Sequence, residues 1–200
     1  MSDPSRFQTI SAALLTGGSP TPAGTDASHL LVGGIAGATR LARELAHLFE
    51  DVLLVGGDPP SDAPGRRVAD RSGAESALRG VVTALEAART DRVLIVAGNL
   101  PLLTPELVLA LIAWPEADLV LPRADARALC GLYCRAPVLP VAQRHLDAER
   151  LALDDLHREL ETTELGPEEI ARVDPRAVAL TTVDTPADAE AAEALLAEGT

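Results

Sequence analysis

The chain has 200 residues, of which 47% are hydrophobic and 2% aromatic, and this suits one ordinary α/β domain with its own apolar core. Its formal charge is −13, and all 17 basic residues are Arg. This balance excludes the basic surface and aromatic stacking platforms of nucleic-acid-binding proteins, and it disfavours binding to anionic membranes. We therefore expect neither nucleic acid nor membrane as a partner.

The N-terminal segment and the two cysteines both favour a cytoplasmic protein. Residues 1–6 lack the basic start and apolar stretch of a signal peptide. Every apolar run is broken by Gly, Pro or charge well short of the roughly 20 residues that a transmembrane helix needs. Cys130 and Cys134 have neither a second pair nor a neighbouring His to complete a zinc site, so we expect reduced thiols.

Short β-rich runs alternate with longer helical runs along the chain. This pattern predicts a single-domain, Rossmann-like α/β fold over residues 1–200, with a mostly parallel sheet and helices on both faces. The predicted strands are Thr9–Leu15, Asp51–Val55, Arg67–Ala69, Arg92–Ala97, Ala117–Leu121, Leu129–Cys134 and Ala177–Thr182.

Helical periodicity and capping signals predict the helices. Apolar residues recur at helical spacing over Ile35–Phe49 and Ser76–Arg89. Two Thr-Pro pairs, at Thr104 and Thr185, supply an N-cap followed by proline at the first helical position. The second pair opens an acidic, alanine-rich tail that we expect to be a solvated helix, and residues 56–65 are predicted to form a loop from their Gly and Pro content.

A glycine-rich turn follows the first predicted strand, which ends at Leu15. The turn begins Thr16-Gly17-Gly18 and continues to Asp26. Glycines allow backbone N–H groups to approach phosphate oxygens, so this turn suits a nucleoside triphosphate. Such loops usually add a Lys or Arg that balances the charge of phosphoryl transfer, and this one has neither.

Two further polar residues follow predicted strands. Asp70 comes after the third strand and Asn99 after the fourth, within Gly98-Asn99-Leu100-Pro101. Open α/β sheets bind ligands beyond the carboxyl ends of their strands, so both residues are candidates for one site. A Mg²⁺ ion there would favour a charged oxygen ligand, whereas Asn99 offers a neutral carbonyl.

Local structural roles compete with binding at several of these positions. Asp26 also suits a turn or a helix cap, and Asp70 suits an Asx turn at the end of a strand. Several arginines could reach the phosphates from neighbouring loops in place of the Lys or Arg that the turn lacks, or they could be solvated surface residues. These are Arg66, Arg67, Arg71, Arg79 and Arg123.

Taken in order, the motifs resemble the MobA-like nucleotidyltransferase family, which includes the molybdenum cofactor guanylyltransferases. The family begins with Leu-Ala-Gly-Gly, then Arg-Met-Gly, one variable residue and Asp-Lys. Here Leu15, the two glycines after Thr16, and Asp26 match, while Pro22 stands for the Arg and Ala27 for the Lys. The family's metal-binding Asp corresponds to Asn99 in this sequence.

Three other segments extend the resemblance over almost the whole chain. The family's Asp followed by Gly-Pro-Leu-Ala-Gly is similar to Asp70 followed by Ser76-Ala77-Leu78-Arg79-Gly80. Its Gly/Ala-Leu-Tyr strand resembles residues 131–133. Its Asn-x-Asn/Asp-Thr-Pro-x-Asp segment resembles residues 183–188.

The resemblance implies a nucleotide-diphospho-sugar transferase type of fold and an enzyme that transfers GMP from GTP to molybdopterin, with Mg²⁺ held at Asn99. It assigns no catalytic residue. The nucleotide-binding residues that it implies are Leu15, Thr16, Gly17, Gly18, Asp26, Asp70 and Asn99.

Because Pro22, Ala27 and Asn99 replace the family's charged residues, two alternatives stay open. The first is a catalytically inactive relative that binds nucleotide or cofactor, or regulates a partner protein. The second is a related transferase for another phosphate or phospholactate acceptor.

Overall fold

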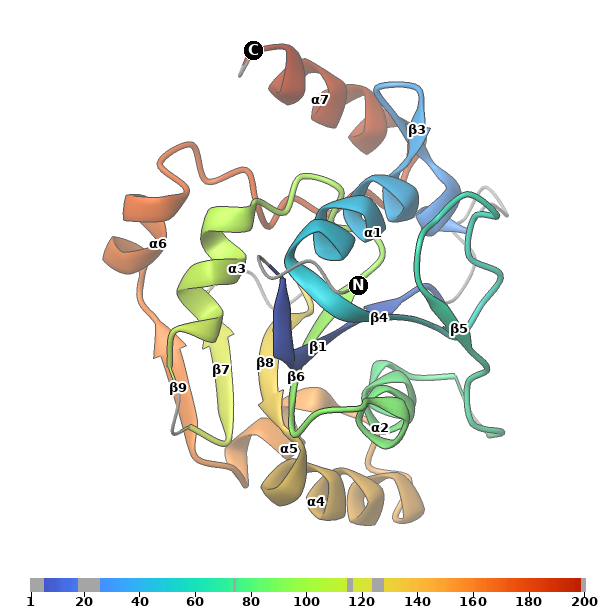
Figure 1. The fold of residues 1–200 in the computed structure, drawn as a ribbon, viewed down its shortest axis with the longest axis vertical. Coiled ribbons are helices and arrows are strands. Elements are labelled where there is room, and N and C mark those ends of the chain that lie inside the picture. The colour runs from blue at the N-terminus through green and yellow to red at the C-terminus, as the bar shows by residue number, and fades with distance from the viewer. Residues whose placement is uncertain (1–5, 18–25, 74, 115–116, 124–127, 199–200) are drawn as a thin grey trace.

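The computed structural model describes residues 6–17, 26–73, 75–114, 117–123 and 128–198. Its main sheet has seven strands in the order β5-β4-β1-β6-β8-β7-β9 (Figure 1). The strands are β1 (Phe7–Leu15), β4 (Phe49–Val55), β5 (Arg66–Val68), β6 (Arg92–Ala97), β7 (Leu119–Pro122), β8 (Cys130–Cys134) and β9 (Thr162–Leu165). β8 runs antiparallel to its neighbours β6 and β7, and the other pairs are parallel. The predicted α/β fold with a mostly parallel sheet is confirmed.

Helices cover both faces of the sheet, as predicted. One face is covered by α1 (Gly37–Leu48), α3 (Pro105–Ile112) and α6 (Pro167–Val173), and the other by α2 (Ala77–Ala87), α4 (Arg135–Asp147) and α5 (Leu153–Arg158) (Figure 1). The apolar periodicity of α1 and α2 accounts for this placement. Leu41 and Leu45 of α1 are buried in one core layer, and Leu78 and Leu85 of α2 are buried in the other.

The central strand β1 contributes to both core layers. Ile10, Ala12 and Leu14 point to the α1 side, while Ala13 and Leu15 point to the α2 side. Side chains alternate between the faces of a strand, and a parallel sheet is covered on both faces, so an almost continuous apolar run is required here. The first strand is therefore held firmly in the middle of the sheet.

A small satellite lies beside α1. It contains a 3₁₀ turn (η1, Ala27–His29), the two-stranded β2 (Leu31–Val32) and β3 (Ile35–Ala36), and the last helix α7 (Pro186–Ala197), whose Ala189 and Ala192 are buried against the residues of this region. The helix start predicted at Thr185 is confirmed, because its Oγ1 accepts the Asp188 N–H at 3.2 Å and the Asp188 side chain reciprocates.

The strand predicted at Ala177–Thr182 is wrong. The Asp174 carboxylate accepts the N–H groups of Val178 and Ala179 at 3.1 and 2.8 Å, which ties this segment into turns. The edge of the sheet next to β7 is instead formed by β9, whose sequence Thr-Thr-Glu-Leu carries only a weak apolar signal.

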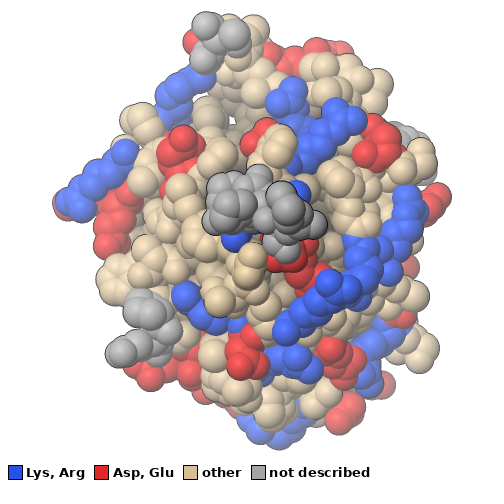
Figure 2. Space-filling view, in the orientation of Figure 1, with Lys and Arg blue, Asp and Glu red and all other residues tan. Residues whose placement is uncertain are grey.

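Within the described residues, no helix combines the length and apolar character needed to cross a membrane. Cys130 and Cys134 are free thiols. On the face in Figure 2, arginine side chains lie next to acidic ones. Ion pairs such as Arg71–Glu86 and Arg144–Glu159, both at 2.6 Å, therefore neutralise part of the positive charge within the protein.

Candidate functional site

The strand order places a crevice at the carboxyl end of β1. The chain first builds β4 and β5 on one side of β1, and then crosses through α2 to add β6 on the other side. Such a reversal of strand order separates the loops that leave neighbouring strands and opens a binding crevice between them. The turns after β1, β4 and β6 bring Gly17, Gly57 and Asn99 to this crevice.

Hydrogen bonds hold the three turns against one another. Thr16 donates its N–H to the Val55 carbonyl at 2.9 Å and its Oγ1 to the Gly56 carbonyl at 2.8 Å. Gly98 donates its N–H to the Leu15 carbonyl at 2.8 Å. Thr16 is thus a buried residue that joins two turns, and the exposed backbone of this region begins at Gly17.

The crevice has two connected parts. The larger, of about 380 Å³, extends toward the start of α2 and is lined by Asp70, Ser76 and Arg79. The smaller, of about 170 Å³, extends toward α7 and is lined by Ser28 and Asp184. The lining residues common to both parts are Leu15, Gly17, Asp26, Ala97 and Asn99.

Asp70 and Arg79 form an ion pair in the larger part. Arg79 Nε donates to Asp70 Oδ2 at 3.1 Å, and the two side chains are only 12% and 19% exposed. Thr83 Oγ1 donates to Asp70 Oδ1 at 2.6 Å, and the Arg79 guanidinium also contacts the Gly73 carbonyl. Asp70 Oδ1 also accepts the N–H of the next residue, Arg71, at 3.0 Å, which is not the contact two residues on that defines the predicted Asx turn.

Arg79 differs from the other four arginines considered above. It is the one Lys or Arg among the described residues that line either part of the crevice. Arg66, Arg67, Arg71 and Arg123 have side chains that are 38%, 50%, 43% and 71% exposed. The surface interpretation is therefore wrong for Arg79, whose position in the chain is the one where the family's Gly-Pro-Leu-Ala-Gly segment has Ala.

Asp26 caps η1 and also lines the crevice. Its Oδ1 accepts the Ser28 N–H at 2.9 Å, which is the capping role that its side chain suits. Asp26, Asp70 and Glu75 make the lining acidic apart from Arg79. Gly18 and Pro22 lie outside the described residues.

Asn99 lies beside a carboxylate from the C-terminal segment. Its Nδ2 donates to Asp184 Oδ1 at 2.7 Å, while its Oδ1 is buried and has no hydrogen-bond partner among the described residues. The sequence places these two residues 85 positions apart, so no local pattern predicts the contact. The oxygen donors of the type that Mg²⁺ prefers in this part of the crevice include the carboxylates of Asp26 and Asp184 beside the Asn99 amide.

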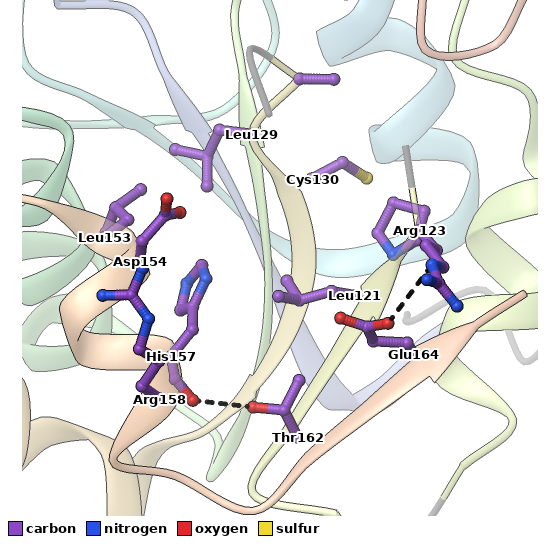
Figure 3. Close-up of a pocket in the computed structure, with 12 residues that line it drawn as sticks. Leu121, Arg123, Leu129, Cys130, Leu153, Asp154, His157, Arg158, Thr162 and Glu164 are labelled. Atoms are coloured by element: carbon purple, nitrogen blue, oxygen red, sulfur yellow. Dashed lines mark hydrogen bonds and ion pairs between the residues drawn. The ribbon is translucent and has the colours of Figure 1, made fainter. Parts of the chain in front are cut away.

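A second cavity of about 370 Å³ adjoins the crevice at Leu129, which lines both (Figure 3). It lies among β7, β8, β9 and α5, with Arg123 and Arg158 at its border. Arg123 pairs with Glu164 at 3.9 Å, and Thr162 Oγ1 donates to the His157 carbonyl at 3.1 Å.

Burial shifts the pKa values of the titratable groups beside this second cavity. It lowers the pKa of His157, which keeps the ring neutral near pH 7, and it raises the pKa of the Cys130 thiol to about 12. His157 Nε2 lies 3.3 Å from the Tyr133 hydroxyl, whose pKa burial also raises. Cys130 is thus an unreactive thiol in this environment.

The mostly parallel sheet and the crevice where its strand order reverses define an α/β protein of the doubly wound type. The family model of the MobA-like NTP transferase domain matches residues 12–163. The chain is also 30% identical, over 94% of its length and 95% of the relative's, to a probable molybdenum cofactor guanylyltransferase of Chloroflexus aggregans. A protein of the same description from Carboxydothermus hydrogenoformans is 27% identical over 92% and 95% of the two chains. The chain therefore belongs to the MobA-like NTP transferase family.

Solved structures agree on the fold. The molybdopterin-guanine dinucleotide biosynthesis protein A of Archaeoglobus fulgidus superimposes with a TM-score of 0.81 at 16% identity, over 96% of this chain and 100% of that one. The 2-C-methyl-D-erythritol 4-phosphate cytidylyltransferase of Thermus thermophilus gives 0.68 at 18% identity, over 92% and 98%. The nucleotide-diphospho-sugar transferase type of fold implied by the resemblance is confirmed.

Proposed function

We propose that residues 1–200 form one domain that transfers GMP from GTP to molybdopterin in the cytoplasm. Family membership and the names of its relatives support this function. The crevice lined by Arg79 and several carboxylates is the site that we propose for it. In the transfer, an oxygen of the molybdopterin phosphate forms a bond to the α-phosphorus of GTP. The bond between that phosphorus and the bridging oxygen breaks, and pyrophosphate leaves.

In this proposal each part of the crevice has a task. The backbone at Gly17 lies beside the phosphates, and the Asp70–Arg79 pair lines the same crevice, where Arg79 adds positive charge toward the phosphates. Bound Mg²⁺ would supply charge neutralisation for the phosphates, and the oxygens at Asn99 and Asp184 are the groups that would hold it. The Asp184 carboxylate supplies a negatively charged oxygen beside Asn99, whose own amide oxygen is neutral.

Calorimetric titration with GTP tests this proposal directly. We expect binding that depends on Mg²⁺ and that is stronger for GTP than for ATP or CTP, followed by turnover with molybdopterin. Absence of binding to every nucleotide would favour the inactive relative that regulates a partner, and GTP turnover with a different phosphate acceptor would favour the related transferase.

The second cavity is our proposed site for the acceptor, because it opens beside the crevice at Leu129 and presents Arg158 to an anionic molecule. We expect Arg158→Ala to raise the KM for molybdopterin about tenfold, as loss of one charged hydrogen bond does, and to leave the Kd of GTP unchanged. Steady-state kinetics at saturating GTP measures this effect.

Arg176→Ala is the matched control. Arg158 pairs with Asp155 at 2.6 Å and Arg176 pairs with Glu198 at 3.2 Å, both at the surface, but Arg176 lines neither cavity. Equal KM values for the two variants would place the acceptor elsewhere.

A further inference from the structure

The second cavity combines apolar walls with a few polar side chains. Its apolar lining includes Leu121, Leu129 and Leu153, and two of its polar residues, Asp154 and His157, both belong to α5. Side chains three positions apart share one face of a helix. Figure 3 shows the Asp154 carboxylate and the His157 ring extending from α5 into the cavity. The volume of about 370 Å³ is in the range of pockets that hold small organic molecules.

A buried hydroxyl group holds the His157 ring in place. The Tyr133 side chain is fully buried, and its hydroxyl lies 3.3 Å from His157 Nε2. Phe would fill the same volume without the cost of burying a polar group, so the hydrogen bond to His157 is what the hydroxyl adds. Thr162 Oγ1 donates to the His157 carbonyl at 3.1 Å, which fixes the backbone as well. The imidazole therefore has a defined position in the wall of the cavity.

The two polar residues offer different groups to a ligand. Asp154 forms no hydrogen bond or ion pair with another described residue, so both of its carboxylate oxygens can accept N–H groups. Burial lowers the pKa of His157, and the charge of Asp154 opposes this shift only in part, so the ring is neutral near pH 7. When the Tyr133 hydroxyl donates to Nε2, the ring proton lies on Nδ1. The cavity then offers two acceptor oxygens beside one neutral donor.

We propose that Asp154 and His157 select the acceptor by the 2-amino-4-oxo edge of a pterin ring, which presents two N–H donors beside a carbonyl oxygen. Asp154 accepts the two N–H groups, and the Nδ1–H of His157 donates to the carbonyl oxygen. The apolar walls cover the faces of the ring, and Arg158 remains available for the phosphate. This inference rests on the proposed function, because it assigns the pterin end of the acceptor within the same cavity.

Two fluorescent probes test this selection without turnover. Pterin-6-carboxylate has the proposed edge, whereas lumazine-6-carboxylate carries an oxygen in place of the amino group. We expect the wild-type protein to bind the pterin about 10–100-fold more tightly, because the lumazine places an oxygen against the Asp154 carboxylate. Asp154→Asn keeps the shape but exchanges one acceptor for a donor, and it should remove this preference. Asp147→Asn, at an exposed carboxylate that lines neither cavity, should keep it.

Tyr133→Phe tests the positioning of His157. The variant keeps the buried ring and removes only the hydroxyl, so it should remain folded and should weaken pterin binding about 3–10-fold. Imidazole ¹⁵N NMR gives a readout that a packing role would not move. The wild-type His157 should carry its proton on Nδ1, and Tyr133→Phe should shift that proton toward Nε2.

The outcomes separate this inference from the proposed function. Equal affinity for the two probes in the wild-type protein, or no binding of either, would overturn the inference alone. An unchanged preference in Asp154→Asn, or a wild-type His157 that carries its proton on Nε2, would also overturn it alone. The proposed function fails instead if GTP and molybdopterin give no turnover, whatever the affinities of the two probes.

Discussion

Gly57→Ala is expected to lower the free energy of unfolding by about 2–4 kcal/mol and to weaken GTP binding about 10–100-fold. Gly57 has a φ of +55°, and a Cβ there would lie 2.4 Å from the Thr16 carbonyl oxygen and 3.0 Å from the Gly17 Cα. These are backbone atoms, which cannot rotate away. The added methyl group must therefore push apart the two turns that form the floor of the crevice.

Gly34→Ala provides the matched control for this result. Gly34 also has a positive φ, of +74°, but nothing lies within 4 Å of the position of its Cβ. Only the backbone cost of roughly 1 kcal/mol applies, and GTP binding should be unaffected. Urea unfolding and calorimetry measure both quantities, and similar losses in the two variants would contradict the close contact between the turns.

Arg79→Ala is expected to weaken GTP binding about 10–100-fold and to cost about 1–3 kcal/mol of stability, because the largely buried Asp70 carboxylate loses its partner. The crevice lining would then keep its carboxylates and lose the Arg79 guanidinium, which is the positively charged group among the described lining residues. Because a charge acts most strongly on a charged ligand, the loss should be larger for GTP than for guanosine. Titrations with both ligands measure the difference.

Two further variants separate the sources of this effect. Adding Asp70→Asn to Arg79→Ala removes the unpaired carboxylate and should recover part of the lost stability without restoring the preference for GTP over guanosine. Arg71→Ala removes the arginine that follows Asp70 in the chain and pairs with Glu86 outside the crevice, and it should leave binding unchanged. If Arg79→Ala weakened the binding of GTP and of guanosine equally, Arg79 would act only by positioning Asp70.

Much of the fold could be predicted from local patterns, and the errors have physical causes. The strands and helices around residues 9–15 and 76–89 carry strong apolar periodicity, and the observed β1 and α2 follow it closely. Helix α4 went unpredicted because it contains Pro140, a residue that local propensity places outside helices. The short edge strand β9 is polar, and its pairing with β7 depends on a neighbour about 40 residues away in the chain.

The sequence by itself determined the fold class, the family and the turns from which a site would be built, because glycine turns, caps and apolar runs act through neighbouring residues. It also showed that charges were missing at Ala27 and Asn99. Only the tertiary structure decided which other charged side chains lie in the crevice. Arg79 approaches Asp70 through the loop before α2, and Asp184 approaches Asn99 across 85 residues. Such contacts arise when sheet and helices pack, so spacing along the chain does not encode them.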